Sequence, residues 1–130
     1  MILIVPIPSV LAKPFVDQYC DDFGTSKENS PNYGLDVLWY GAISHGQIQA
    51  VIGYVALPEG VYVHSYHHMK TFAGKRSFLA LNTFTYNLKM PLWGYIRNDN
   101  PSMFYRMLKE GWAVVGGTDN ETLVNWSCYN

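Results

Sequence analysis

The stretch from Val61 to Trp112 constrains the fold more than any other part of the chain. It opens with an alternating segment, VYVHSYHH, and continues with a basic, glycine-containing turn that leads into a helical pattern, MKTFAGKRSFLALNTFTYNL. A second strand-like run and a short helix that Gly111 closes follow it. Two strands separated by a helix need a crossover connection, so this pattern predicts that the two strands lie parallel in one sheet.

Length and composition predict one globular domain that covers residues 1–130. The chain has 130 residues, of which 48% are apolar, and this is enough for one core and too little for two domains. A formal net charge of −1 and a pI of about 6.4 give no electrostatic basis for binding nucleic acid or an anionic membrane. Ten tyrosines and four tryptophans favour strands and large packing surfaces.

The cysteines and the N-terminal segment favour a cytoplasmic protein. Cys20 and Cys128 lie near opposite ends of the chain, and this single pair is more typical of two free thiols in a reducing compartment than of a disulfide. The start of the chain is apolar but has no basic residues before its apolar run, and Pro6, Pro8 and Pro14 interrupt it. It therefore indicates a first strand, and neither a signal peptide nor a membrane span.

The segments before the central stretch predict a strand, a helix and a hairpin. An apolar run at residues 2–5 forms the strand, and Ser9 can cap a helix that extends to residue 22, with its start delayed by Pro14. The polar residues 24–34 form a loop that either borders a substrate site or is plain surface. Residues 35–42 and 47–57 are two β-rich runs around a short turn, so we expect them to form a hairpin.

A second hairpin closes the chain, formed by residues 112–116 and 122–129. The complete order is then β-α-β-β-β-α-β-α-β-β, an α/β fold with a mixed α+β sheet and helices on both faces. The final residues, WSCYN, carry little charge. We therefore expect the last strand to be a free edge at which a homo-oligomer could pair.

Three histidines in the first strand of the central stretch are candidate functional residues. Strict alternation places Val63 and His67 on one face of this strand and His64, Tyr66 and His68 on the other. Two residues four apart on a strand are roughly 13 Å apart, too far to bind one ion together, so no metal site is predicted. His64 or His68 could accept a proton from an attacking amine, or both could be packed, hydrogen-bonded residues without a catalytic role.

The densest basic cluster consists of Lys70, Lys75 and Arg76, at the start of the predicted central helix. Cations oppose the helix dipole at an N-terminus, so their presence there favours a bound anion. A diphosphate site and a solvated helix start both remain open as interpretations.

The element order and the motifs of the central stretch resemble those of the GNAT superfamily of N-acetyltransferases. In that superfamily one strand bulges and splays from its neighbour, and the following loop and helix N-terminus bind the pyrophosphate of acetyl-CoA through backbone N–H groups. The resemblance implies acetyl transfer from acetyl-CoA to an amine. It places the pyrophosphate at Gly74, Lys75, Arg76 and Ser77, and Asn100 facing the cofactor arm.

Two positions depart from the pattern of this superfamily. The pyrophosphate loop usually reads [QR]-x-x-G-x-[GA], and this chain has Thr71 at the first position and Arg76 at the last. Asn100, Gly111 and Trp112 match the later helix pattern, but the place of its tyrosine acid falls on a methionine, Met107. Tyr105, two residues away on another helix face, is the nearest candidate acid.

The segments HHMKTFAGKRSF and NDNPSMFYRMLKEGW are also similar to those of divergent GNAT-like proteins of tailed phages, including the small internal virion protein of short-tailed phages. This resemblance implies a second function, a non-catalytic role in virion structure or in binding a viral or host protein. The location would then be the host cytoplasm or the virion, and no cofactor would be needed.

Overall fold

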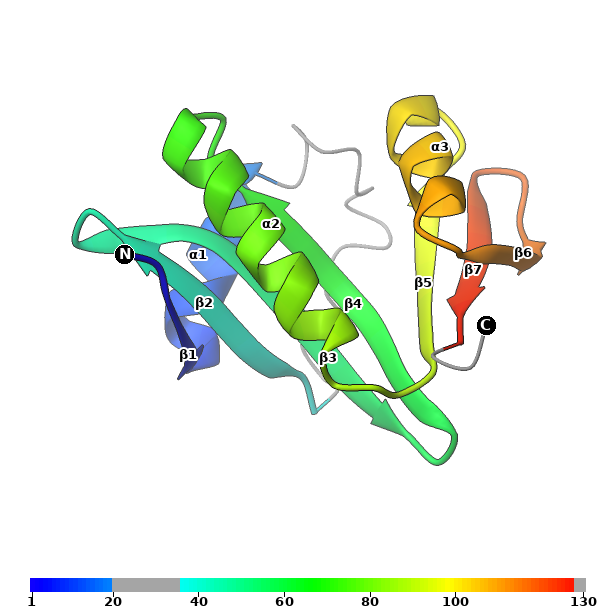
Figure 1. The fold of residues 1–130 in the computed structure, drawn as a ribbon, viewed down its shortest axis with the longest axis horizontal. Helices are drawn as coiled ribbons and strands as arrows, with labels where there is room; N and C mark the ends of the chain where they lie inside the picture. The colour runs from blue at the N-terminus through cyan, green and yellow to red at the C-terminus, as the bar shows by residue number, and fades with distance from the viewer. Residues whose placement is uncertain (20–35, 128–130) are drawn as a thin grey trace.

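The chain folds into a seven-stranded mixed sheet with helices on both faces, in a computed structural model that describes residues 1–19 and 36–127 (Figure 1). The predicted order of strands and helices is confirmed. The elements are β1 (Leu3–Ile7), α1 (Ser9–Tyr19), β2 (Leu38–Ser44), β3 (Gln47–Leu57), β4 (Gly60–His68), α2 (Phe72–Tyr86), β5 (Leu92–Arg97), α3 (Pro101–Lys109), β6 (Ala113–Gly117) and β7 (Glu121–Trp126).

The strands lie in the order β1-β2-β3-β4-β5-β7-β6. Strands β1 to β4 form an antiparallel meander, and β5, β7 and β6 are antiparallel to one another. Only the junction between these two parts, β4 with β5, is parallel. The strand–helix–strand prediction for the central stretch is therefore confirmed, with α2 as the crossover between β4 and β5.

Helix α1 begins at Ser9, and the predicted delay by Pro14 is wrong. The Pro8 carbonyl accepts hydrogen bonds from Leu11 N at 3.0 Å and Ala12 N at 3.2 Å, so the helix is established before Pro14, which lies inside it. Pro14 has no backbone N–H, so α1 lacks one helical hydrogen bond. The burial of Ala12, Phe15 and Val16 against the sheet offsets this loss of stability. The predicted end at residue 22, the loop 24–34 and both cysteines lie outside the described residues. No helix in the described ranges has the length and apolarity needed to span a membrane.

Two cores lie on opposite faces of the sheet and confirm the prediction of helices on both sides. Under α1, Phe15 and Val16 pack with Trp39 and Val51. Under α2, the core has ten buried members in the described part of the chain. They are Ala42, Ala50, Ile52, Tyr54, Val61, Leu81, Leu92, Ile96, Trp112 and Val124. In Figure 1, α2 crosses the front of β3 and β4, and α1 lies behind the sheet.

A β-bulge at His64 overturns the strict alternation expected for β4. Gly53 of β3 pairs with Ser65, and the next residue, Tyr54, pairs with Val63, so His64 is an extra residue between two successive register pairs. The bulge shifts the alternation by one residue. As a result Val63 and Tyr66 both pack against the core under α2, although alternation placed them on opposite faces.

The last strand is not the edge of the sheet, which corrects the expectation drawn from WSCYN. Strand β7 lies between β5 and β6, with Leu92 paired to Trp126 and Val114 paired to Val124. Strands β6 and β7 form a hairpin, and its second strand, β7, is the one that bonds to β5. Strand β6 is therefore the edge of the sheet at this side, and all five of its residues are exposed. Pairing of two copies at this edge stays a prediction.

Candidate functional site

Strands β4 and β5 touch at one end and then diverge. Their parallel register consists of Val61 with Leu92 and Tyr62 with Trp93. Gly60 fixes this junction, because a Cβ there would lie 2.2 Å from the Pro91 carbonyl oxygen, and the same oxygen accepts from Val61 N at 2.9 Å. Among the described residues the register between the two strands ends with this second pair, and the strands separate beyond it.

Gly94 of β5 leaves space in the divergence. It is buried, yet among the described residues a Cβ built on it would have only the Val63 carbonyl oxygen of β4 within 4 Å, at 3.8 Å. A glycine within a strand often marks a close approach of another chain or a ligand. A slender acyl group could therefore lie beside Gly94 between the strands.

The loop after β4 leads directly into a capped helix. The Thr71 hydroxyl oxygen accepts a hydrogen bond from Gly74 N at 2.9 Å, and the Thr71 carbonyl accepts from Lys75 N at 3.0 Å. Gly74 is required here, because a Cβ would lie 2.0 Å from the Met69 carbonyl oxygen. The first-turn amides of Phe72 and Ala73 have no intrahelical acceptor and point out of the helix, where an anion can bind them.

The four residues predicted to bind pyrophosphate all lie in the first part of α2, but they point in two directions. Gly74 and Ser77 are buried, and the Ser77 hydroxyl has no hydrogen-bond partner among the described residues. Lys75 and Arg76 are exposed, with the Arg76 guanidinium 5.8 Å from the centre of the exposed Phe72 ring. The two cations can therefore meet a diphosphate at the helix start, and Gly74 shapes the backbone that would hold it. Their role in binding stays a prediction.

His64 lies at the bulge, on the same face of β4 as Tyr62 and opposite to α2. The His64 ring lies 6.0 Å from the Tyr62 ring in an edge-to-face arrangement, and His64 Nδ1 lies 3.0 Å from Ser65 Oγ. Burial lowers the pKa of His64. A histidine that stays neutral near pH 7 can accept a proton.

His68 lies on the other face, at the end of β4 next to the start of α2. Its ring packs edge-to-face on Phe78 at 4.8 Å, and its Nδ1 lies 2.8 Å from the Met69 carbonyl oxygen. Burial lowers the pKa of His68, the bond to Met69 raises it, and the charges of Lys75 and Arg106 lower it. The two histidines that the sequence singled out together are therefore separated by the sheet.

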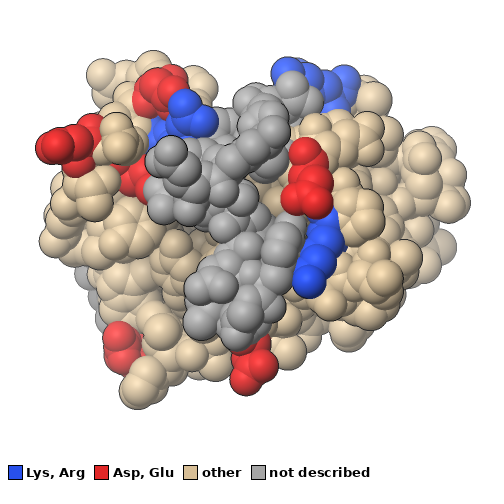
Figure 2. All heavy atoms as spheres, turned by 180° about the vertical axis from the view of Figure 1, so that it is seen from behind, with Lys and Arg blue, Asp and Glu red and all other residues tan. Residues whose placement is uncertain are grey.

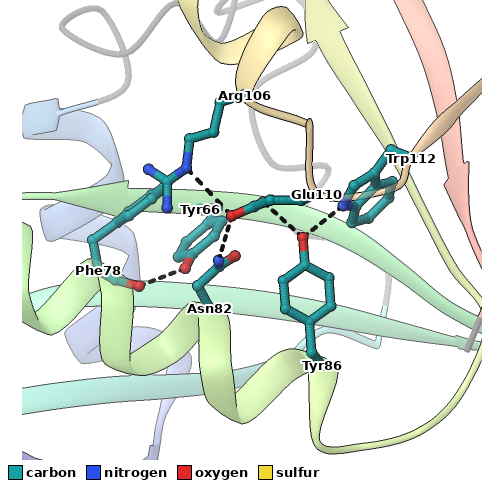
Figure 3. A network of polar contacts seen from close by, with 7 residues as sticks. All are labelled: Tyr66, Phe78, Asn82, Tyr86, Arg106, Glu110 and Trp112. Atoms are coloured by element: carbon teal, nitrogen blue, oxygen red, sulfur yellow. Dashed lines mark hydrogen bonds and ion pairs between the residues drawn. The ribbon is translucent and has the colours of Figure 1, made fainter. Parts of the chain in front are cut away.

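A polar network joins α2 to the end of α3 (Figure 3). Glu110 is its centre, because its carboxylate accepts from Asn82 Nδ2 at 3.0 Å and from the Tyr86 hydroxyl at 2.7 Å, and pairs with Arg106 Nε at 3.5 Å. Trp112 Nε1 donates to the Tyr86 hydroxyl at 2.7 Å. This network holds α3 at a fixed distance from α2.

Arg106 also extends over the aromatic residues between the two helices. Its guanidinium lies 4.9 Å from the centre of the Phe78 ring, which stacks on Tyr66 at 4.1 Å and 13°. The Tyr66 hydroxyl donates to the Phe78 carbonyl at 2.6 Å. In Figure 3 the Arg106 side chain points from α3 toward α2. A cation and an aromatic pair therefore occupy part of the space between α2 and α3.

The α3 residues singled out by the sequence take different positions. Asn100 is the N-cap of α3, and its side-chain oxygen accepts from Met103 N at 3.3 Å. Met107 packs against the core, while Tyr105 is 63% exposed and touches the Phe104 ring. The assignments of Tyr105 as an acid and of Asn100 as a cofactor contact stay predictions.

No three histidine, cysteine, aspartate or glutamate side chains in the described parts of the chain lie close enough together to hold a metal ion. Sequence reasoning missed Gly94 and the Arg106–Glu110 network. A glycine inside the strand-like run LWGYIR was an available signal for the first. The hydrogen bonds of the network join residues that are 24 to 28 positions apart in the sequence, so no local sequence pattern predicts them.

Comparison with known proteins shows a likeness in structure without one in sequence. No protein-family model matches the chain, and no curated protein matches it. An IAA acetyltransferase from Bacillus cereus has a TM-score of 0.73 and 14% identity over 97% of this chain and 99% of its own. A GNAT family acetyltransferase from Elizabethkingia anophelis with acetyl-CoA bound has a TM-score of 0.70 and 13% identity over 97% of each chain. A PaiA N-acetyltransferase from Thermoplasma acidophilum in complex with coenzyme A has a TM-score of 0.65 and 13% identity over 98% of this chain and 99% of its own.

These neighbours show that the chain has the fold of the GNAT N-acetyltransferases, as the sequence resemblance implied. They give no support to the finer resemblance to phage virion proteins.

Proposed function

We propose that this protein is an acetyl-CoA-dependent N-acetyltransferase, a single domain that transfers an acetyl group to an amine. The observation that carries the proposal is the divergence of β4 from β5 next to the open side of Gly94. A sheet normally keeps its ladder bonded, and the two parallel pairs here end where a buried glycine leaves room. Neighbours with the same fold are acetyltransferases, and two of them hold acetyl-CoA or coenzyme A.

The cofactor would lie on the α2 face of the sheet. Its diphosphate would meet the first-turn amides of α2 and the exposed cations Lys75 and Arg76. Asn100, at the start of α3, would face the cofactor arm across from α2. The bound cofactor supplies the acetyl thioester, which would lie between the strands beside Gly94.

His64 is the proposed base, because it lies beside the divergence and burial keeps its imidazole neutral. The amine nitrogen forms a bond to the thioester carbonyl carbon, the carbon–sulfur bond breaks, and His64 takes the proton that the nitrogen loses. The thiolate takes a proton from solvent or from Tyr105. Holding amine and thioester together would account for much of the rate, so the methionine at position 107 does not prevent the reaction.

Calorimetric titration with acetyl-CoA tests the proposal. We expect micromolar binding that Gly94→Val weakens at least about 30-fold, roughly 2 kcal/mol, because the valine side chain fills the space beside β5. Gly116→Val is the matched control: this strand glycine also has a single neighbour, Leu123 Cδ2, at 3.8 Å, but lies on the exposed edge strand β6. Absence of heat from folded wild-type protein would overturn the proposal.

Charge reversal gives an independent test of the cofactor's position. Arg76→Glu should weaken acetyl-CoA binding about tenfold, because a phosphate loses a charged partner. Lys109→Glu, the same change on an exposed residue at the end of α3, should leave the affinity unchanged. Equal losses in both variants would mean that the cofactor does not bind at the start of α2.

A second candidate is a non-catalytic GNAT-fold protein with a viral or host protein as partner, in the host cytoplasm or the virion. The observation that favours it is the group of side chains between α2 and α3, where Arg106 covers Phe78 and Glu110 joins both helices. A non-catalytic protein does not need an open cofactor cleft, so side chains can fill the space between α2 and α3. The titration decides between the two candidates, since only the first requires acetyl-CoA to bind.

A further inference from the structure

The divergence of β4 and β5 can be reached from two faces of the sheet. Val61, Leu92 and Ile96 belong to the core under α2. Because side chains alternate along a strand, the residues between them, among them Tyr62 and Tyr95, point to the opposite face. If the cofactor binds on the α2 face, Tyr62 and Tyr95 lie on the side from which the other substrate would approach.

Three rings line this second face beside the divergence. Tyr62 contacts Tyr95 edge-to-face at 6.2 Å and 72°, and it contacts His64 edge-to-face at 6.0 Å and 83°. Tyr62 is half-buried, while Tyr95 is 45% exposed. Tyrosine faces carry partial negative charge and attract cations, most strongly where water is partly excluded.

A carboxylate lies next to these rings. Glu121 of β7 pairs in register with Arg97 of β5, two residues beyond Tyr95. Burial raises the pKa of Tyr62 to about 12, with further contributions from the charges of Tyr95 and Glu121. Glu121 is itself partly buried. The carboxylate of Glu121 therefore places a negative charge next to the three rings.

The surroundings of Glu121 are acidic as well. Arg97, whose charge acts on Glu121, also donates from Nε to Asp99 at 2.8 Å and so shares its charge with that second carboxylate. In Figure 2, acidic side chains lie at the end of the molecule that β5 to β7 occupy, with basic side chains next to them. A cationic ligand is therefore favoured here over an anionic one.

We propose that the acceptor is an amine that carries a second positive charge, with its reacting nitrogen next to His64 and its other cation against Tyr62, Tyr95 and Glu121. This inference rests on the proposed acetyl transfer and adds the class of acceptor. A short alkyl diamine is the simplest ligand of this class. An amine with a carboxylate in place of the second cation is disfavoured by Glu121.

Nuclear magnetic resonance titration of the full chain tests this without any turnover. The probes are 1,4-diaminobutane, butylamine and 4-aminobutanoate, which share a four-carbon chain and differ at one end. We expect the diamine to shift the tyrosine ring signals and to bind at least about tenfold more tightly than butylamine, with 4-aminobutanoate the weakest. Equal affinities for diamine and butylamine, or no binding of either, would overturn the proposal.

Matched variants locate the site. Glu121→Gln should weaken diamine binding about tenfold and leave butylamine binding unchanged, since it removes only the charge. Tyr95→Leu should weaken diamine binding, while Tyr95→Phe keeps the ring and the affinity. Asp17→Asn, an equal loss of charge on the exposed side of α1, should change nothing. If Asp17→Asn lost the preference for the diamine over butylamine and Glu121→Gln kept it, the second ammonium group of the diamine would not bind at Glu121.

The calorimetric titration with acetyl-CoA separates this proposal from the one on which it rests. Protein that binds acetyl-CoA but does not distinguish the three amines would retain the acetyltransferase function and lose this acceptor class. Protein that binds the diamine but not acetyl-CoA would retain a cation site without the transfer reaction.

Discussion

Tyr86 donates a hydrogen bond from its hydroxyl to Glu110 Oε2 at 2.7 Å, and this contact joins the last turn of α2 to the end of α3. The same hydroxyl accepts from Trp112 Nε1 at 2.7 Å, so one oxygen serves two partners. Burial raises the pKa of Tyr86 well above its usual value. The hydroxyl therefore remains protonated near neutral pH and can keep donating to Glu110.

Removing this hydroxyl should destabilise the protein. Tyr86→Phe leaves a Glu110 oxygen and the Trp112 N–H without their partner, so we expect a loss of about 1–3 kcal/mol in the free energy of unfolding. Urea denaturation followed by tryptophan fluorescence measures it. Tyr105→Phe, at an exposed position on α3, should change stability by less than about 0.5 kcal/mol. Similar values for the two variants would mean that the network adds no stability.

His67 should make the protein sensitive to acid. Its side chain is fully buried, and burial, with smaller contributions from His68 and His64, lowers its pKa from 6.5 to about 4. Because the folded protein holds the neutral form, full stability is present above pH 6.5. It is lost as pH falls from 6.5 toward 4, where the unfolded chain binds the proton first, by about 3 kcal/mol in all.

The variant His67→Leu should flatten this part of the stability curve, because an apolar side chain of similar size has no proton to bind. His45, exposed in the turn between β2 and β3 at φ 54°, provides the control, since asparagine tolerates that conformation. Urea denaturation at pH 7, 5.5 and 4.5 gives the comparison. An unchanged slope in His67→Leu would show that other groups cause the acid sensitivity.

Gly74 should not tolerate a side chain. A Cβ there would lie 2.0 Å from the Met69 carbonyl oxygen, so Gly74→Ala must displace the loop between β4 and α2 and should cost about 1–3 kcal/mol. Gly94→Ala has its nearest contact at 3.8 Å and should cost less than about 1 kcal/mol. Thermal denaturation compares the two. A larger loss at Gly94 than at Gly74 would contradict the packing described at both positions.

Arg106 allows the two candidate functions to be compared at one residue. Arg106→Met keeps the stem that packs near Phe78 and removes the charge. If acetyl-CoA lies between α2 and α3, losing this cation should weaken its binding about tenfold, by calorimetry. Tighter binding in the variant would show instead that Arg106 occupies the cofactor's space, as the non-catalytic function requires.

Local patterns predicted most elements of this fold. The alternation in VYVHSYHH, the basic, glycine-containing turn after it, and the closing Gly111 each involve only a few neighbouring residues, so the sequence alone indicates β4, α2 and α3. The parallel pairing of β4 with β5 also followed, because a helix between two strands requires a crossover. The placement of β7 inside the sheet did not follow, since it depends on which of two similar strands bonds to β5.

The residue types in the candidate site were visible in the sequence, but their arrangement was decided by tertiary structure. The sequence by itself determined that the histidines of β4 would lie close to a basic helix start that contains Gly74. Only pairing with β3 inserted the bulge at His64, which shifts the alternation and separates His64 from His68 across the sheet. A bulge arises from the register of two strands, and register depends on packing against distant residues rather than on the neighbours of His64 in the chain.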